Sequence, residues 1–471
     1  MQAQGNANAE VSGLPSWSRS EWTEAAAALA AGGLLRVWML GRFFQADGDP
    51  LIYGDIAKNL LLRGTYGFSS GGGVEPTLIR LPGYPLFLAA CFHLFGVDKY
   101  GSACWIQIAL ELAGCLLLAD VARRIAPQGL GRAAARSTLW LAVLCPFTAI
   151  YAATPLAEAL TLAAIAAALW SVVRFQVQPS WGNALVFTVA VTYVALLRPD
   201  GALVAVALAP ALLLALRSAK RKQLAMVMVC GLLALAPFAV WTARNWRVFH
   251  VVQPLAPRSA ADPGDPVYKG WDAWTRTWCL DFICTYQVCW NVPGGALDID
   301  QLPARAMDTP AQRAATKALA DAYNANGYNL SPALDADFAQ LAAERAAAYP
   351  WRTNILLPAG RMADMWLRPR VENLPIDLDW WVYRHHHTET IFSWAYAVLN
   401  ALYLLLAAAG LWLRPRLWPW MLLYCVLRSA LLLTVQAPEA RYTLECFPVL
   451  FVLGGLALAA GWRRFQVRSI A

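Results

Sequence analysis

Residues 46–85, which read ADGDPLIYGDIAKNLLLRGTYGFSSGGGVEPTLIRLPGYP, follow directly after the first long apolar segment of the chain. Charged side chains gather here, although charged residues make up only 14% of the 471-residue sequence. They are Asp47, Asp49, Asp55, Lys58, Arg63, Glu75 and Arg80. Charges held beside a membrane face are costly and usually serve a function. We therefore expect the functional site to lie around this stretch.

The remainder of the chain has the composition of a membrane protein, with 59% hydrophobic residues and a mean hydropathy of +0.43. Apolar runs of about 18 residues or more recur, which is the length that a helix needs to cross the hydrocarbon core. About ten spanning helices are expected, at 22–44, 101–120, 136–153, 156–173, 183–197, 201–216, 223–243, 389–412, 417–436 and 445–462. The shorter apolar run 86–95 predicts an interfacial helix. The predicted fold class is an all-α polytopic membrane protein with a small extracytoplasmic domain.

The chain divides into three parts. Residues 1–244 form an N-terminal membrane part, which includes a first outer loop at 46–100, and residues 389–471 supply the last membrane helices. Between them, residues 245–388 are the only sizeable segment without spanning helices, and apolar residues are too few there for a large independent core. We expect this segment to pack on the membrane part, through helices at 335–348 and 355–367, the second lying on the membrane.

The loops between the apolar segments alternate in charge. One set is basic and almost free of acids, and it comprises residues 123–136, 174, 217–222, 414–416 and 463–468. By the positive-inside rule these loops and both termini face the cytoplasm, so the acid-bearing stretches 46–100 and 245–388 face the other side. The predicted location is the bacterial inner membrane with the active site on the periplasmic side. The net charge of +8 resides in these loops and does not indicate nucleic-acid binding.

Carboxylates near the start of the first outer loop are the candidates for catalysis. Asp47 and Asp49 have a spacing that can share a divalent cation, but the same spacing recurs elsewhere in the chain, so the pattern is weak. This pair alone follows a spanning helix and precedes Tyr53 and Asp55. The plainer alternative is that Asp49 caps a helix that begins at Pro50, and capping and catalysis are compatible.

Basic side chains at other outer helix ends are candidates for holding an anion. Arg80 and Tyr84 flank a rigid Pro-Gly turn that suits a phosphate at membrane depth, although a snorkelling arginine beside an interfacial tyrosine is equally consistent. The remaining members of this set are Arg198, Arg244, Arg441 and Tyr442. Arg198 can instead form a local ion pair with Asp200. Glu158 lies one turn into an apolar helix, where a buried acid needs a partner or a cavity.

Cysteine and histidine clusters give weaker signals. Cys279, Cys284 and Cys289 lie on the predicted oxidising side, where one disulfide can form, but the sequence leaves the pairing open. Residues 385–387 are three consecutive histidines, which share no helix face and are a poor metal cage. We interpret them as solvated interfacial side chains. No phosphate-binding or dinucleotide-binding glycine motif is present, so a substrate must reach the outer face in another form. A lipid-linked donor fits that geometry.

The motifs around the first outer loop resemble those of the C-class integral membrane glycosyltransferases, in particular bacterial relatives of dolichyl-phosphate-mannose–protein mannosyltransferases and of the lipid A aminoarabinose transferase. The resemblance rests on Asp-x-x-x-Tyr-x-x-Ile-Ala at residues 49–57 and on Arg-x-Pro-Gly-Tyr-Pro at 80–85. Further matches are Thr154 to Glu158, Leu197 to Pro199, Arg244-Asn245, and Arg441-Tyr442 followed by Pro448. It covers the membrane part, whereas residues 245–388 match poorly and are expected to select the acceptor.

The resemblance implies inverting transfer of a sugar from a polyprenyl-phosphate donor to a lipid, glycan or protein acceptor. Asp49 is then the catalytic carboxylate, with Asp55 and Asp47 as alternatives, and the cations bind the donor phosphate. Glu158, Glu75 and Tyr53 are expected to line or support the cavity. Family members differ in metal use, so a divalent cation at Asp47 and Asp49 stays an open question. The alternative functions are a transporter or flippase for a lipid-linked sugar and a non-catalytic scaffold.

Overall fold

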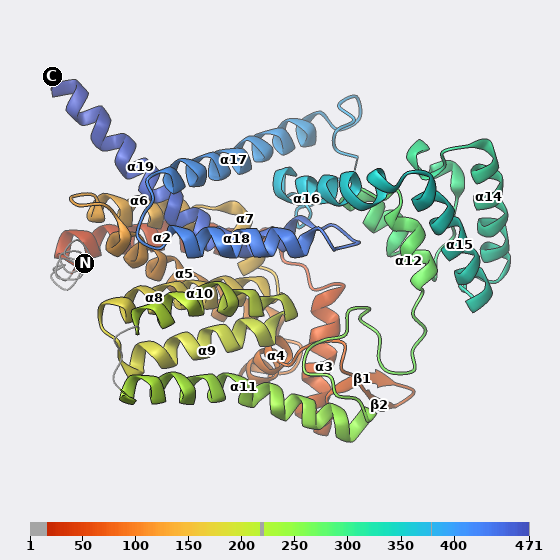
Figure 1. Cartoon of the computed structure of the whole chain (residues 1–471), viewed down its shortest axis with the longest axis horizontal. Helices are drawn as coiled ribbons and strands as arrows, with labels where there is room; N and C mark the ends of the chain where they lie inside the picture. Colours follow the sequence, from red (N-terminus) through yellow and green to blue (C-terminus); the bar gives the residue numbers. More distant parts are fainter. Residues whose placement is uncertain (1–16, 217–220, 378, 471) are drawn as a thin grey trace.

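The computed structural model describes residues 17–216, 221–377 and 379–470 as a helical body with a smaller helical lobe at one end (Figure 1). The predicted cytoplasmic residues Arg217 and Lys220 and the first sixteen residues lie outside these ranges. In the described part the only strands form one hairpin. The predicted all-α, multi-span fold class is therefore confirmed.

Within the described residues, six helices are long and apolar enough to cross a membrane. They are α2 (Arg19–Phe43), α5 (Tyr100–Ile125), α8 (Glu158–Val177), α11 (Arg221–Phe249), α17 (His387–Trp412) and α19 (Phe447–Ile470), the last extended by the short helix η6 (Ala440–Cys446). A bent pair, α6 (Gly131–Val143) and α7 (Pro146–Ala152), would make a seventh span with a 56° bend. Shorter apolar helices are α4 (Gly83–Phe95), α9 (Trp181–Leu197), α10 (Ala202–Ala215) and α18 (Trp418–Leu432). Each of the ten predicted ranges falls on one of these helices or on the bent pair.

Local sequence signals explain several helix ends. Ser18 and Glu21 form a capping box at the start of α2, so the first backbone N–H groups of the helix are satisfied. Pro146 begins α7 and cannot continue the hydrogen bonding of α6, which accounts for the bend. The carbonyl freed at Val143 accepts a hydrogen bond from Arg36 Nη1 at 2.7 Å. The break is thus compensated inside the body.

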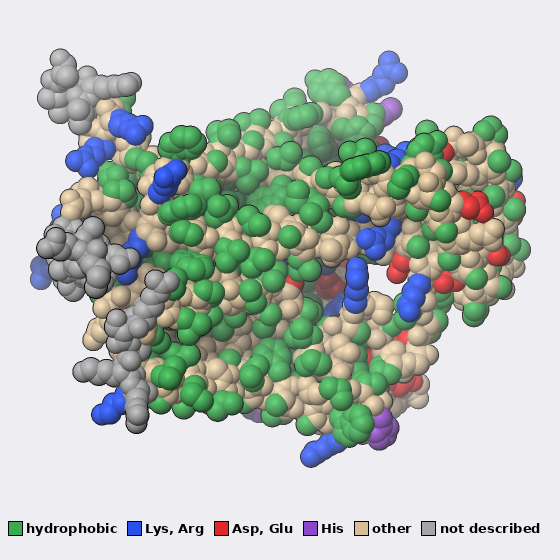
Figure 2. Space-filling view, in the orientation of Figure 1, with side chains coloured by type: hydrophobic (Ala, Val, Ile, Leu, Met, Phe, Trp, Pro, Cys, Tyr) green, Lys and Arg blue, Asp and Glu red, His purple; other side chains and the backbone are tan. Residues whose placement is uncertain are grey.

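Small residues let the helices of the body approach closely. α17 packs along α19, and α5, α8 and α9 pack in sequence. Gly410 on α17 shows how tight the contact is, because an added Cβ would lie 1.9 Å from the Leu453 carbonyl oxygen of α19. Hydrophobic side chains cover the flank of the body, and basic side chains gather at the end where α2 begins and α19 ends (Figure 2). An apolar flank with basic side chains at one end is the distribution expected of a membrane-embedded body.

The first outer loop folds into α3 (Asp49–Arg63), a hairpin of β1 (Gly67–Ser70) and β2 (Gly73–Pro76), and α4. Helix α3 starts after Gly48, whose φ of +61° suits glycine, and it carries a proline in its first turn. It ends at Gly64, which adopts the left-handed conformation. The helix predicted at 86–95 exists, and α4 packs against α3.

The lobe is built from α12 (Lys269–Arg276), α13 (Phe282–Cys284), α14 (Pro310–Ala325), α15 (Pro332–Ala348) and α16 (Leu357–Leu367). It has a hydrophobic core of its own, in which Trp271, Trp274 and Trp278 are nearly or fully buried. The Phe338 ring of α15 lies 5.1 and 5.2 Å from the rings of Trp271 and Trp274. The segment thus has a hydrophobic core of its own, which is much smaller than that of the body. Tryptophan buries a large area per residue, so a short apolar count suffices.

Candidate active site

Asp49, the first residue of α3, lies between two arginines that come from opposite ends of the chain. Its Oδ1 accepts a hydrogen bond from Arg80 Nη2 at 2.9 Å, and its Oδ2 accepts one from Arg441 Nη2 at 2.9 Å. Arg80 belongs to the turn before α4, and Arg441 belongs to η6. All three side chains remain 18–24% exposed, so the arrangement is reachable from outside the protein.

The electrostatics of this arrangement keep Asp49 ionised. Burial raises the pKa of the Asp49 carboxyl, but the guanidinium groups of Arg441 and Arg80 outweigh burial and hold that pKa below its usual value. The guanidinium of Arg80 also lies 5.8 Å from the centre of the Tyr53 ring. Its Nε is buried and has no hydrogen-bond partner among the described residues. One donor of Arg80 is thus uncommitted, beside a carboxylate that is fixed in place.

Arg441 is held by two further acids. Its Nε lies 2.6 Å from Glu439 Oε2, and its Nη1 lies 3.7 Å from Glu158 Oε1 at the start of α8. The Tyr442 hydroxyl donates a hydrogen bond to Glu439 as well. The partner that the sequence required for the buried Glu158 is therefore Arg441, together with Arg198 at 3.2 Å.

A second group of charges extends the cluster inward. Arg198 Nε lies 2.6 Å from Glu445 Oε1 and 3.4 Å from Asp200 Oδ1, so the predicted local pair with Asp200 is only one of its contacts. Arg428 of α18 is fully buried and binds Glu445 at 2.6 Å and Asp200 at 3.0 Å. Four arginines and five carboxylates thus meet at neighbouring ends of α3, α8, α10, α18 and η6. We call this set the charge cluster. Its members are Asp49, Arg80, Glu158, Arg198, Asp200, Arg428, Glu439, Arg441 and Glu445.

Several predicted site residues lie elsewhere. Asp47 is exposed, and its carboxylate makes no ion pair or hydrogen bond with the described residues. Asp55 accepts hydrogen bonds from the Ser69 N–H and hydroxyl, both at 2.7 Å, and so fixes the hairpin to α3. Glu75 is exposed and accepts a hydrogen bond from Ser70 at 2.7 Å. Of the three aspartates predicted to be catalytic, Asp49 is therefore the one that faces the arginines.

Two predicted phosphate ligands are occupied by other partners. Tyr84 is fully buried and donates its hydroxyl to Gln107 Oε1 at 2.6 Å, so it does not extend the donors of Arg80. Arg244 donates to the carbonyl oxygens of Thr77 and Tyr66, both at 2.7 Å, and thereby braces the chain just before Arg80. Through these hydrogen bonds, Tyr84 and Arg244 stabilise the first outer loop and its packing on the body.

Three members of the charge cluster escaped the sequence reasoning, namely Arg428, Glu439 and Glu445. Arg428 and Glu445 interrupt otherwise apolar segments, and an ionisable residue in such a segment is by itself a signal of function. Applying that rule to every apolar segment, as it was applied to Glu158, would have found both. Glu439 sits in a loop among proline and alanine and carries no comparable signal.

The geometry does not favour a metal at Asp47 and Asp49. Both oxygens of Asp49 already accept hydrogen bonds from guanidinium groups, and Asp47 points to solvent. Among the described residues, the groups of three that could hold a metal are Cys279 with Cys284 and Cys289, and Asp377 with Asp379 and His386. His386 is largely buried and has Asp379 Oδ1 3.1 Å from its Nε2, so the expectation of a freely solvated histidine is wrong at this position.

Residues 76–241 match the model of the dolichyl-phosphate-mannose-protein mannosyltransferase family. The resemblance inferred from the motifs is thereby confirmed over this part of the chain. The matching segment contains Arg80, Glu158 and Arg198, but it begins after Asp49 and ends well before Arg441. The charge cluster thus joins the family segment to residues on either side of it.

No curated protein matches the chain. Among solved structures, the oligosaccharyltransferase of Archaeoglobus fulgidus aligns with a TM-score of 0.46 and 12% identity over 97% of this chain and 52% of its own. ArnT from Cupriavidus metallidurans, bound to undecaprenyl phosphate, aligns with a TM-score of 0.39 and 15% identity over 95% of this chain and 79% of its own. The chain thus spans about half the length of the archaeal enzyme.

Proposed function

We propose that this protein is a membrane glycosyltransferase that moves a sugar from a polyprenyl-phosphate donor to an acceptor at the outer face of a bacterial inner membrane. The observation that carries the proposal is the placing of the Asp49 carboxylate between Arg80 and Arg441, with both arginines partly exposed. A carboxylate beside partly exposed guanidinium groups supplies the two things that such a transfer needs. One is a group for the acceptor hydroxyl, and the other is a site for the lipid phosphate.

The proposed topology has ten spans and both termini in the cytoplasm. Residues 1–244 and 389–471 form the membrane part, and residues 245–388 form the extracytoplasmic part, which includes the lobe. The short helices α9, α10 and α18 would complete the count of ten spans, since each lies beside longer helices of the body. The basic end of the body in Figure 2 supports this orientation, and the charge cluster then lies at the outer face.

In the proposed reaction, the acceptor hydroxyl oxygen attacks the anomeric carbon while the bond from that carbon to the phosphate oxygen breaks. The leaving polyprenyl phosphate takes the electron pair, and the acceptor proton passes to Asp49 or through it to water. Asp49 is a weak base because its pKa is depressed. Its main contribution is therefore to orient the hydroxyl and to stabilise positive charge on the sugar as the bond to phosphate lengthens.

The donor phosphate would bind at the exposed side of the charge cluster. Arg80 and Arg441 are both partly exposed and hydrogen bond the two oxygens of the same Asp49 carboxylate, so a phosphate on the exposed side can bridge the two guanidinium groups. Arg428 is fully buried and is committed to Glu445 and Asp200. It would position Arg198 and η6 without touching the lipid.

Retention of undecaprenyl phosphate by the purified protein tests the proposal without knowledge of the sugar. Native mass spectrometry of the full chain, incubated with undecaprenyl phosphate in micelles, should show a bound lipid that Arg80→Ala and Arg441→Ala each lose at least about tenfold. Arg63→Ala is the matched control, because Arg63 is an exposed arginine of α3 outside the charge cluster. Equal retention by all four proteins would refute the proposed donor site.

A further inference from the structure

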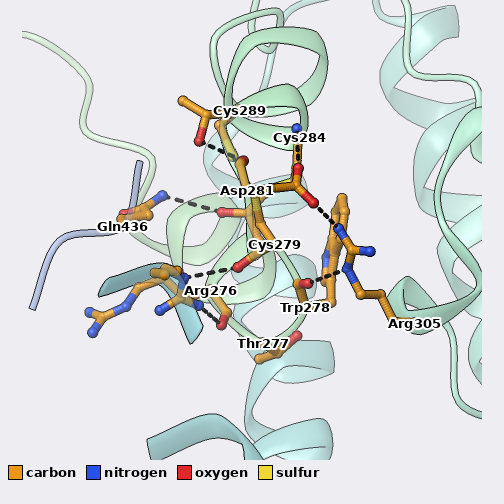
Figure 3. Close-up of a disulfide and its surroundings, with 12 residues drawn as sticks. Arg276, Thr277, Trp278, Cys279, Asp281, Cys284, Cys289, Arg305 and Gln436 are labelled. Atoms are coloured by element: carbon orange, nitrogen blue, oxygen red, sulfur yellow. Dashed lines mark hydrogen bonds and ion pairs between the residues drawn. A yellow bond between two sulfur atoms is a disulfide. The ribbon is translucent and has the colours of Figure 1, made fainter. Parts of the chain in front are cut away.

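Three cysteines meet in the core of the lobe (Figure 3). Cys279 and Cys284 form a disulfide, and Cys289 keeps its thiol. The sulfur of Cys289 lies 3.7 Å from that of Cys279, and all three sulfurs lie within 4.8 Å of one another. The Cys289 thiol is therefore within reach of a disulfide sulfur, and its side chain must rotate to bring the three sulfurs into the line that thiol–disulfide exchange requires.

The surrounding contacts hold Cys279 from one side and Cys284 from the other. Arg361 of α16 donates from Nε to the Cys279 carbonyl at 2.9 Å. Asp281 accepts a hydrogen bond from the Cys284 N–H at 2.9 Å and is itself paired with Arg305 at 2.7 Å. Figure 3 shows Arg305 on one side of the cysteines and Gln436 on the other. The two halves of the disulfide are thus anchored to different parts of the chain.

Cys289 is connected to the charge cluster through two residues. Burial raises the pKa of the Cys289 thiol, but the Thr275 hydroxyl of α12 lies close enough to that thiol to lower its pKa in part. Gln436, in the loop after α18, donates from Nε2 to Thr275 Oγ1 at 3.2 Å and to Asp272 Oδ1 at 2.8 Å. Gln436 precedes Glu439 in the same loop, and the helix η6, which contains Arg441, follows directly. Gln436 thus links the cysteine site to the segment that holds Arg441.

We propose that Cys279, Cys284 and Cys289 form a thiol–disulfide exchange site, in which Cys289 can replace Cys284 as the partner of Cys279. Cys289 loses its proton to solvent, and its thiolate attacks the Cys279 sulfur. The new bond joins Cys279 to Cys289, while the Cys279–Cys284 bond breaks and Cys284 leaves as a thiolate that takes up a proton. No electrons are gained or lost overall, so neither an oxidant nor a reductant is needed. The inference does not depend on the proposed transfer reaction.

The environment of Cys289 makes the exchange slow at neutral pH. Burial raises the pKa of its thiol to about 12. The thiolate is the attacking species, and its fraction grows as the pH increases toward the pKa. The exchange rate should therefore rise about tenfold for each unit by which the pH is increased, as long as the pH is below the pKa. The site would therefore hold either pairing for long periods under ordinary conditions.

Disulfide mapping of the wild-type chain tests the exchange. The full-length protein is incubated in micelles at pH 7, 8 and 9, quenched in acid, unfolded and alkylated with N-ethylmaleimide. We expect the label on Cys289 at first and on Cys284 as well after incubation, with the rate of its appearance increasing about tenfold per pH unit. Label that stays on Cys289 alone at every pH would overturn the proposal.

A pair of serine variants tests the connection to Gln436. Cys289→Ser retains the Cys279–Cys284 bond, whereas Cys284→Ser, treated with oxidised glutathione, should form the Cys279–Cys289 bond and release two equivalents of reduced glutathione. Free thiols at both Cys279 and Cys289 in treated Cys284→Ser would contradict the proposal. Hydrogen exchange at residues 433–446 should differ between the two variants, and adding Gln436→Leu to each should remove the difference. Identical hydrogen exchange at residues 433–446 in the two serine variants would refute the coupling between the cysteine site and the charge cluster.

Discussion

Two arginine–carboxylate arrangements in this protein look alike in their chemistry and differ in how completely they are closed. Arg36 and Glu111 lie inside the body with 0% and 3% of their side chains exposed, and they form a bidentate pair at 2.6 and 2.8 Å. The remaining Nη1 of Arg36 donates to the Gly32 and Val143 carbonyls. Every donor group of that guanidinium is used, and nothing faces outward.

The arrangement around Asp49 is open by comparison. Arg80 and Arg441 share one carboxylate, keep about a fifth of their side chains exposed, and leave Arg80 Nε without a partner. A closed pair can only stabilise a fold, because no ligand can reach it. An open one can exchange a protein partner for a ligand. Substitutions in the two places should therefore have opposite effects on stability and activity.

The largest effect is expected at the closed pair. Glu111→Gln leaves the Arg36 charge buried without its counter-ion, so the free energy of unfolding should fall by about 3–5 kcal/mol. The double change Arg36→Met with Glu111→Leu replaces both charges by apolar groups and should recover most of that loss. Unfolding in mixed detergent micelles measures both, and a stable Glu111→Gln protein would show that the pair adds nothing.

Asp49→Asn should have the opposite effect, with a large loss of activity and little loss of stability. Sugar transfer from a polyprenyl-phosphate donor should fall by roughly a hundredfold or more, the usual scale for losing a catalytic carboxylate. Because the group is partly exposed, unfolding free energy should change by no more than about 1 kcal/mol. Asp47→Asn, two residues away and exposed, is the control and should transfer normally. A fully active Asp49→Asn protein would remove Asp49 from the reaction.

A smaller effect is expected when Arg80 is replaced by lysine, which keeps the positive charge but not the planar guanidinium group. Lysine keeps the charge but lacks the planar fork whose separate nitrogens can pair with Asp49 and a phosphate oxygen, so Arg80→Lys should lower transfer about tenfold. Arg80→Ala should lower it further. Initial rates at saturating donor distinguish the variants, and a lysine variant equal to wild type would mean that only the charge matters.

The smallest effect is the response of Asp49 to pH. Because its pKa in the folded protein lies below the ordinary value of 3.8, the stability that Asp49 contributes is present above the unfolded pKa. It is lost only as pH falls through the lower folded value. Between pH 5 and 8 neither its charge nor its contribution to stability should change. A rate profile with an acidic limb between pH 5 and 8, displaced along the pH axis by Asp49→Glu, would contradict this assignment.

Local properties were readable from the sequence. The spanning helices follow from hydropathy, and Pro50 marks the start of α3 to within one residue, because chain length and proline act locally. The predicted cap at Asp49 is wrong, since Gly48 is the N-cap and no side chain caps the helix. The same reasoning singled out Asp49, Arg80, Glu158, Arg198 and Arg441, which the structure brings together. Each sits at a helix end or in a turn, where a charge beside a membrane stands out.

The tertiary structure alone decided which charges face one another. Asp49 and Arg441 are 392 positions apart, and no local rule relates them. Packing also turned Tyr84 toward Gln107 and Arg244 toward backbone carbonyls, so two side chains with suitable chemistry were committed elsewhere. Buried polar groups must find partners, and the available partners depend on which helices become neighbours. Sequence therefore determined the candidates, and the packing of the helices selected among them.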